Sequence, residues 1–317
     1  GAATAGRARA VHAGSAAQAA AEAAAAFGGN HTSTWAVLAC TSRYWFNYRH
    51  VANTLAMYRT VKRLGVPDER IVLMLGDDVA CDARNALAPA VYAGGAAGAG
   101  AGSNPNLYGE SIEVDYRGYE ASSEALLRVL TGRHPPGTPR SRTLPTDAAS
   151  NVLVFLSGHG GDEFLKFLDK TEASAHDFAS AVAQMRAQRR FNEMLFMVDT
   201  CQATTLLERF TTRGVVGAAS SAKGENSYSL PTDSKLGVAT IDRWTHAVLG
   251  AAENVAPDSA LTLAELFAGA TPRAIGSTPA LRAELAGRGA DEILATDFFG
   301  SVYRFEDVGD EPFDLAL

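Results

Sequence analysis

Two apolar runs of strand length, each closed by reactive polar residues, constrain the fold of this chain most strongly. The run at 151–156 ends in Ser-Gly-His159-Gly-Gly, and the run at 194–198 ends in Asp-Thr-Cys201-Gln. Short apolar runs bounded by Gly and polar residues are typical of buried parallel strands. In open α/β sheets, ligands lie just beyond the carboxyl ends of the strands. The pattern therefore predicts that His159 and Cys201 reach one edge of a parallel sheet from two separate strands.

Further strand and helix patterns alternate along the chain. Strands are expected at 35–40, 71–75 and 215–219, with a terminal strand near 297–303. Helices are expected at 51–64, at 122–130 between a Ser122 cap and Gly132, from a capping box at 174–177, and at about 241–253. This alternation favours an α/β fold with a parallel sheet and helices on both of its faces.

The ends of the chain and two inner stretches differ from this pattern. Residues 1–30 are rich in Ala and are expected to be a flexible N-terminal segment, and 94–102 reads as a Gly/Ala linker. Residues 133–150 form a long loop rich in Pro, Arg and Thr. We expect one folded domain over 31–306 and a tail over 307–317.

The charge and the apolar runs of the chain argue against a nucleic-acid-binding protein and against a transmembrane helix. The net charge is -7 over 317 residues, so the chain does not have the basic character of a nucleic-acid-binding protein. The sequence contains no run of about 18 apolar residues, so no transmembrane helix is expected.

The residues around His159 and Cys201 suit nucleophilic catalysis. A thiol attacks a carbonyl as the thiolate and needs a neighbouring base, for which His159 is the candidate. Gly160 allows close approach of the backbone, and its N–H together with that of Cys201 would form an oxyanion hole. The alternative is a core cysteine and a turn histidine. Spacing alone leaves both open, and the combination of the two strand ends favours catalysis.

The other two cysteines are expected to have different roles. Cys40 ends an apolar strand and is expected to be a buried core thiol. Cys81 lies in a polar loop, where it is either a free surface thiol or paired with another chain.

The sequence resembles the clan CD cysteine peptidases, which include legumain, caspases and gingipains, and within them the family of GPI-anchor transamidase catalytic subunits. The His-Gly motif at 158–160 and the Cys motif at 199–202 carry the resemblance. Further matching segments lie at 36–55, 70–78, 108–116, 125–133, 158–167, 196–202 and 296–301, within roughly 33–305. The resemblance implies the caspase-hemoglobinase fold, a three-layer α/β/α sandwich with a mostly parallel central sheet, over 31–306.

The resemblance also implies roles for individual residues. Cys201 would be the nucleophile and His159 the general base. Asn47 would complete the site by orienting His159, and the alternative for Asn47 is a loop-capping role. Positions near the substrate pocket of the family are Arg49, His50, Asp199, Ser220 and Ser221.

The implied reaction is transamidation. The enzyme would cleave the C-terminal signal of a proprotein through a thioester on Cys201, and would then transfer the new carboxyl group to the ethanolamine of a GPI glycolipid. The alternative is a legumain-like endopeptidase with water as the acceptor. A non-catalytic scaffold is a third hypothesis, and the presence of both His159 and Cys201 argues against it.

The implied partners are the other transamidase subunits, one of them through a disulfide at Cys81. They would hold the chain at the lumenal side of the endoplasmic reticulum membrane. No cofactor is expected for catalysis. The resemblance also implies a structural Ca²⁺ at Asp68, Glu113 and Asp115, the last two of which lie on one face of an extended strand. The alternative is that these are ordinary solvated acids.

Overall fold

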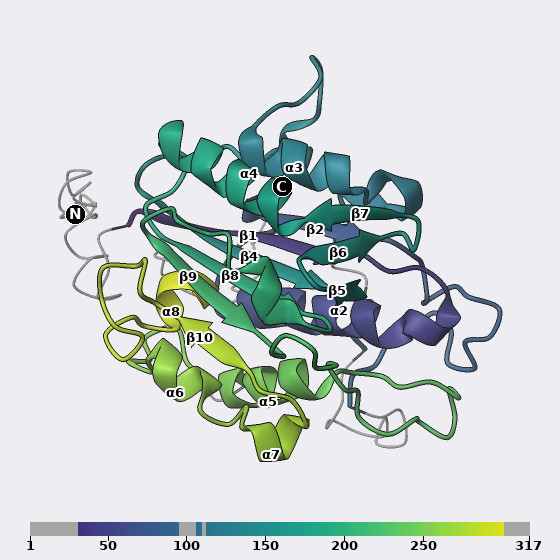
Figure 1. The fold of residues 1–317 in the computed structure, drawn as a ribbon. Helices are drawn as coiled ribbons and strands as arrows, with labels where there is room; N and C mark the ends of the chain where they lie inside the picture. Colours follow the sequence, from purple (N-terminus) through teal and green to yellow (C-terminus); the bar gives the residue numbers. More distant parts are fainter. Residues whose placement is uncertain (1–30, 95–105, 110–111, 254, 301–317) are drawn as a thin grey trace, which may run out of the picture.

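The computed structural model describes residues 31–94, 106–109, 112–253 and 255–300, which form a central sheet covered by helices on both faces (Figure 1). The sheet has seven strands in the order β10-β9-β8-β4-β1-β2-β3. Neighbouring strands are parallel except for the antiparallel β10–β9 pair. The strands are β1 (Ser33–Cys40), β2 (Ile71–Leu75), β3 (Tyr116–Arg117), β4 (Ser150–Ser157), β8 (Met194–Asp199), β9 (Val215–Ala219) and β10 (Ala280–Arg282).

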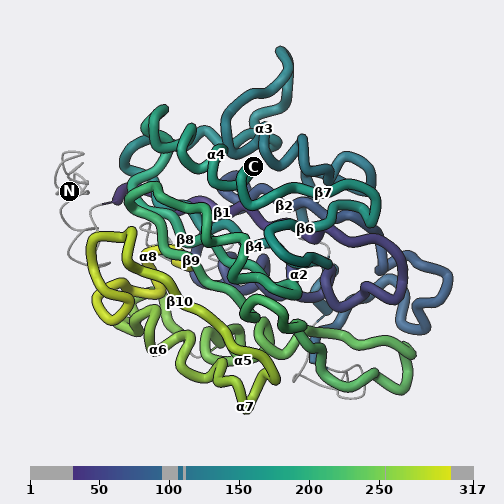
Figure 2. The backbone as a smooth tube through the Cα atoms, viewed as in Figure 1, coloured from purple at the N-terminus to yellow at the C-terminus, as the bar shows by residue number. Residues whose placement is uncertain are grey.

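The helices form two outer layers, as the backbone tube in Figure 2 also shows. One face is covered by α3 (Ser123–Thr131) and α4 (Ala175–Ala187). The other is covered by α2 (Tyr48–Arg63), α5 (Arg243–Ala252), α6 (Leu263–Phe267), α7 (Pro272–Ile275) and α8 (Thr296–Phe299). A small antiparallel sheet of β5 (Gly160–Gly161), β6 (Phe164–Phe167) and β7 (Thr171–Ser174) follows β4. The predicted three-layer α/β/α architecture with a mostly parallel sheet is confirmed.

Burial of the sheet on both faces explains the continuous apolar runs in the sequence. Alternate residues of β1 face opposite layers, so that Leu38 packs in the α2/α5 core while Val37 packs in the α3/α4 core. Cys40 is fully buried, and this burial raises the pKa of its thiol to about 12. The predicted core thiol is confirmed.

The helix ends follow the predicted signals. The Ser122 hydroxyl accepts a hydrogen bond from the first turn of α3, and Gly132 ends this helix with a φ of 69°. Ser174 and Asp177 form the capping box that begins α4.

One predicted element is wrong, and several predictions lie outside the described residues. Where the terminal strand predicted near 297–303 was expected to begin, the structure has the short helix α8. An apolar pair such as Phe298–Phe299 suits either a strand or a helix, and both rings pack into the α2/α5 core. The predictions for 1–30, 95–102 and 307–317 fall on residues that the structure does not describe.

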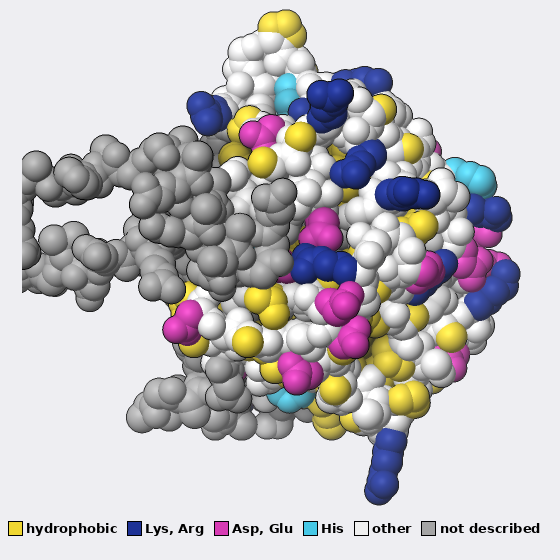
Figure 3. Space-filling model, turned by 90° about the vertical axis from the view of Figure 1, so that its left-hand side faces the viewer, with side chains coloured by type: hydrophobic (Ala, Val, Ile, Leu, Met, Phe, Trp, Pro, Cys, Tyr) yellow, Lys and Arg dark blue, Asp and Glu magenta, His cyan; other side chains and the backbone are white. Residues whose placement is uncertain are grey.

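Charged side chains are unevenly distributed over the surface. On the face shown in Figure 3, Lys and Arg side chains gather in the upper part, and most Asp and Glu side chains lie below them. The upper part corresponds to α3, α4 and the projecting loop that follows α3 in Figure 1. Among the described residues, no helix combines the length and the apolar character needed to cross a membrane.

Candidate active site

The carboxyl ends of four neighbouring strands lie level with one another. Strand pairing places Cys40 of β1 opposite Ser157 of β4, and Ser157 opposite Asp199 of β8. Val198 of β8 is paired in turn with Ala219 of β9. Neighbouring strands are about 4.8 Å apart. The segments that follow these strands therefore meet at one edge of the sheet. All the residues that we predicted for the catalytic and substrate-binding groups lie on these segments, except Asp199, which ends β8.

His159 and Cys201 reach this edge side by side, as predicted. Each lies two residues beyond the last paired position of its strand. A Cβ added to Gly160 would lie 2.6 Å from Oγ1 of Thr200, so the two segments touch and only glycine fits at this position. Gly160 thus lies beside the residue before Cys201, where the predicted oxyanion hole would require it.

Asn47 lies within hydrogen-bond distance of the imidazole of His159. Asn47 is 1% exposed, and its Nδ2 donates to the carbonyl oxygen of Arg43 at 2.6 Å. This bond directs Oδ1 toward His159, whose Nε2 lies 2.7 Å away. An amide oxygen only accepts, so Nε2 carries the proton and donates it. The lone pair of His159 is therefore on Nδ1, which is the nitrogen left to take a proton.

The surroundings of His159 keep it neutral. Burial is the main cause that lowers its pKa, and the charges of Arg49 and Lys166 act in the same direction. Asp169 opposes them. A neutral imidazole at neutral pH is the form that acts as a general base.

Two serines hold the turn that carries Cys201. The hydroxyl of Ser220 donates to the carbonyl oxygen of Thr200 at 3.1 Å, and Ser221 donates to the same oxygen at 2.8 Å. Ser221 also accepts from the backbone N–H of Ala203 at 3.2 Å. Both serines are fully buried. As placed, they contact the protein on both sides of the cysteine, and they support its turn.

Arg49 and His50 lie beside His159 on the first turn of α2. The rings of His50 and His159 meet edge to face with centroids 4.9 Å apart. Burial lowers the pKa of His50 well below its usual value, and the charge of Arg49, together with that of His159 whenever His159 is protonated, acts in the same direction. Nδ1 of His50 lies 2.9 Å from the hydroxyl of Ser42. A neutral, fixed His50 therefore forms one wall next to the base.

Asp242 joins this group and was not predicted from the sequence. Its carboxylate accepts from Nε of Arg49 at 3.1 Å and from Nδ2 of Asn53 at 2.6 Å. Asn53 also donates to the hydroxyl of Ser157 at the end of β4. Asp242 and Asn53 thus connect Arg49 to the strand that delivers His159. No pattern in the sequence signals this contact, because it joins α2 to the start of α5, which is far away along the chain.

Asp199 is a second buried carboxylate at this edge. Its two oxygens accept from the hydroxyls of Ser227 at 2.7 Å and Thr245 at 2.6 Å. Burial, and then the charge of Asp199, raises the pKa of Asp242 to about 7. Two protein hydroxyls therefore fix the position of the Asp199 carboxyl group.

The acids predicted to bind calcium do not form a ligand set as placed. Asp68 accepts from the hydroxyl of Tyr58 and from Nζ of Lys62, the latter at 2.7 Å. Asp115 accepts from a backbone N–H, and burial followed by the charges of Glu113 and Asp68 raises its pKa to about 6. Within the described part of the chain, no group of three His, Cys, Asp or Glu side chains is arranged to hold a metal ion.

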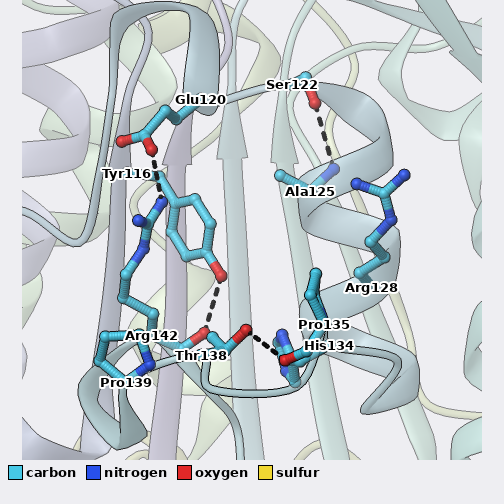
Figure 4. Close-up of a pocket in the computed structure, with 10 residues that line it drawn as sticks. All are labelled: Tyr116, Glu120, Ser122, Ala125, Arg128, His134, Pro135, Thr138, Pro139 and Arg142. Carbon is cyan, nitrogen blue, oxygen red and sulfur yellow. Dashed lines mark hydrogen bonds and ion pairs between the residues drawn. The ribbon is translucent and has the colours of Figure 1, made fainter.

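Two further features lie away from this edge. Cys81 is exposed in the loop after β2, and it is a free thiol in the described chain. A cavity of about 300 Å³ lies between α3 and the loop after it (Figure 4). Its walls include Tyr116, Arg128, His134 and Arg142, and none of the predicted site residues lines it.

Comparisons with known proteins identify relatives of this chain. The model of the peptidase C13 family matches residues 34–277. The GPI-anchor transamidases of Mus musculus and Homo sapiens are each 48% identical over 280 residues, which span 88% of this chain and 69% of the relative. The GPI-anchor transamidase of Saccharomyces cerevisiae is 46% identical over 276 residues, which span 86% of this chain and 65% of the relative. Among solved structures, caspase-1 from Spodoptera frugiperda aligns with this chain over 79% of this chain and 86% of the caspase chain, with a TM-score of 0.44 and 10% sequence identity.

Proposed function

This chain belongs to the peptidase C13 family, and we propose that it is the catalytic subunit of a GPI-anchor transamidase. The observation that carries the proposal is the identity of 46 to 48% to curated GPI-anchor transamidases over most of the chain. The chemistry is that of a cysteine-dependent peptidase whose thioester is passed to an amine.

The first half of the reaction is acylation of Cys201. The thiol proton passes to Nδ1 of His159, and the sulfur attacks the peptide carbonyl at the attachment site of a proprotein. The N–H groups of Gly160 and Cys201 stabilise the oxyanion that forms. The imidazolium then gives its proton to the leaving amine. The C–N bond breaks, the C-terminal signal departs, and a thioester remains on Cys201.

The second half transfers the acyl group. The ethanolamine amine of a GPI glycolipid attacks the thioester carbonyl, the C–S bond breaks, and an amide forms. The proton lost by the amine passes through His159 to the departing thiolate, which restores the thiol. His159 must be neutral for both halves, and its lowered pKa meets this requirement.

The nature of the product tests the proposal against hydrolysis. The complex containing this chain is supplied with a proprotein and a GPI glycolipid, and the new C-terminus is analysed by mass spectrometry. We expect an amide-linked ethanolamine on the proprotein, absent with Cys201→Ala. A free carboxylate as the sole product would replace this proposal with the endopeptidase alternative.

The partners of the chain belong to the same proposal. Both substrates are attached to a membrane, so we propose that other transamidase subunits hold the chain at the lumenal side of the endoplasmic reticulum. The exposed thiol of Cys81 supports a disulfide to one of them. A reducible cross-linked band that disappears in Cys81→Ser is the expected result, and a band that persists in the variant contradicts this role.

The structural calcium ion stays a prediction that rests on the resemblance alone. As the acids are placed, Lys62 already neutralises Asp68. Elemental analysis of the purified, dialysed protein decides the matter. The site is supported if the native chain holds one calcium ion and Glu113→Gln holds none. It is contradicted if the native chain holds no stoichiometric calcium.

A further inference from the structure

Exposed aromatic side chains gather beside the active site. Of the four large hydrophobic side chains that are exposed in the described chain, three lie in the same neighbourhood: Tyr44, Phe46 and Tyr119 at 50%, 61% and 65% exposure. The rings of Tyr44 and Phe46 stack with centroids 5.9 Å apart and planes at 16°. Isolated exposed apolar residues are normal, but a group of aromatic rings marks an interaction surface.

Two cations complete this group, which we call the aromatic row. The guanidinium of Arg43 lies between two rings, 5.5 Å from the centroid of Tyr44 and 4.5 Å from that of Tyr119. The ammonium of Lys170 lies 5.4 Å from the Tyr119 ring. The aromatic row thus comprises Phe46, Tyr44, Arg43, Tyr119 and Lys170. Cations at these distances attract the ring faces, and they fix the row in place.

The backbone of the row is held in an unfavourable conformation. Tyr44 has a φ of 74° and a ψ of 149°, a region that is essentially restricted to glycine. Asp77 holds this conformation by accepting from the Tyr44 N–H at 2.6 Å, and Asp169 accepts from the Arg43 N–H at 2.9 Å. A strained residue that keeps its ring in solvent gains no burial from the strain. This combination points to a binding role for the ring.

The row is continuous with the catalytic groups. Phe46 immediately precedes Asn47, whose oxygen binds His159. The carbonyl oxygen of Phe46 accepts from Arg49 at 3.2 Å. The Phe46 end of the row therefore lies one residue from the asparagine that contacts His159, so a ligand along the row is directed toward the base, where the attacking amine must arrive.

The alternation of rings and cations decides which substrate the row suits. An apolar peptide laid on it would remove water from Arg43 and Lys170 without giving them a partner, which is costly. A sugar chain that carries phosphate offers apolar ring faces to the aromatic rings and oxyanions to the two cations. The amine-bearing glycolipid has this chemistry, and the leaving signal of the proprotein does not.

We propose that the aromatic row binds the phosphate-bearing glycan of the GPI acceptor and presents its amine to the thioester on Cys201. This inference rests on the proposed function. It assigns the acceptor subsite to the loop between β1 and α2, together with Tyr119 and Lys170.

The test is a competition between two amines for the same thioester. The assembled complex receives a proprotein, a GPI glycolipid and hydroxylamine, a small amine without sugar or phosphate. The ratio of glycolipid-linked product to hydroxamate is measured. In the double variant Phe46→Leu, Tyr119→Leu, which keeps apolar bulk and removes the ring faces, we expect this ratio to fall about tenfold or more.

Matched variants separate ring stacking from simple apolar contact. The double variant Phe46→Tyr, Tyr119→Phe keeps both rings, so its ratio should stay near that of the native chain. Lys170→Ala, at an exposed position, should lower the ratio by up to about fivefold, the range of an exposed ion pair. An unchanged ratio in the Leu variant overturns the proposal. An equal loss of both products does so too, because it would place the proprotein on the row.

Two other outcomes are also informative. Loss of the other subunits on purification of the Leu variant overturns the proposal in favour of a subunit interface. If the native chain yields hydroxamate but no glycolipid-linked product, the proposed function itself fails, whatever the variants do.

Discussion

Asn47→Ala should slow acylation of Cys201 without unfolding the chain. The change removes the acceptor that lies 2.7 Å from Nε2 of His159. Loss of a neutral hydrogen bond costs about 0.5–1.5 kcal/mol, and an N–H left without a partner costs about 1–3 kcal/mol. At about 1.4 kcal/mol per tenfold, the rate constant for acylation should fall about ten- to hundredfold.

The assay follows labelling of Cys201 by a peptide acylating probe in a Cys81→Ser background. Cys40 does not interfere, because it is buried and its pKa is about 12. Asn85→Ala is the matched control, since this buried amide holds three backbone carbonyls of the loop after β2 and contacts no catalytic group. A rate for Asn47→Ala within twofold of the control would refute the orienting role.

Asn47→Asp gives a second test of the same contact. A carboxylate in this place would favour the imidazolium and raise the pKa of His159, whereas its surroundings now lower it. The rate falls when the base is protonated, so the acidic limb of the pH–rate profile should move to higher pH. An unmoved limb would show that residue 47 does not face the base.

Three other predictions concern the framework of the site. Ser221→Ala leaves the buried N–H of Ala203 without its acceptor, although Ser220 still donates to the Thr200 carbonyl oxygen, and should lower the free energy of unfolding by about 1–3 kcal/mol in urea titrations. Gly158→Ala places a Cβ 2.0 Å from a threonine hydroxyl and should destabilise the fold by about 1–3 kcal/mol. Gly250→Ala is the matched control: position 250 is an exposed position of α5 with no atom within 4 Å of the added Cβ, and the change should stabilise the fold by about 0.4–1 kcal/mol. The pKa of Asp242 is about 7 in the folded chain and 3.8 ordinarily, so the folded state favours the protonated carboxyl group. The stability that this protonation contributes is lost as the pH rises from about 4 to about 8. In Asp242→Asn, the free energy of unfolding should therefore fall less over the same pH range.

The sheet and its strand ends could be predicted because their signals are local. An apolar run closed by Gly-His-Gly indicates a strand that is buried on both faces of a sheet. The parallel pairing of such strands then brings His159 and Cys201 to the same edge. Helix caps such as Ser122 and Ser174 depend only on residues within one turn. The segment at 297–299 could not be assigned, because a short apolar run suits both strand and helix.

The rest of the site depends on contacts between distant segments. Asp242 precedes α5 and would be interpreted as a helix cap, yet its side chain makes no capping bond and binds Arg49, 193 residues away. Ser220 and Ser221 reach the correct edge, but the sequence does not show that their hydroxyls turn toward the backbone around Cys201. Lys62 reaches Asp68 from α2, and no pattern in the acids alone reveals it.

Rescue of cells that lack their transamidase catalytic subunit tests the central claim most directly. This chain, supplied with a signal peptide, and its Cys201→Ala form are expressed at equal levels, with recovery of the other subunits checked by co-purification. Surface display of a GPI-anchored reporter is scored. We predict display with the native chain and none with the variant. Display with both forms, or with neither although the complex assembles, would contradict transamidation through Cys201.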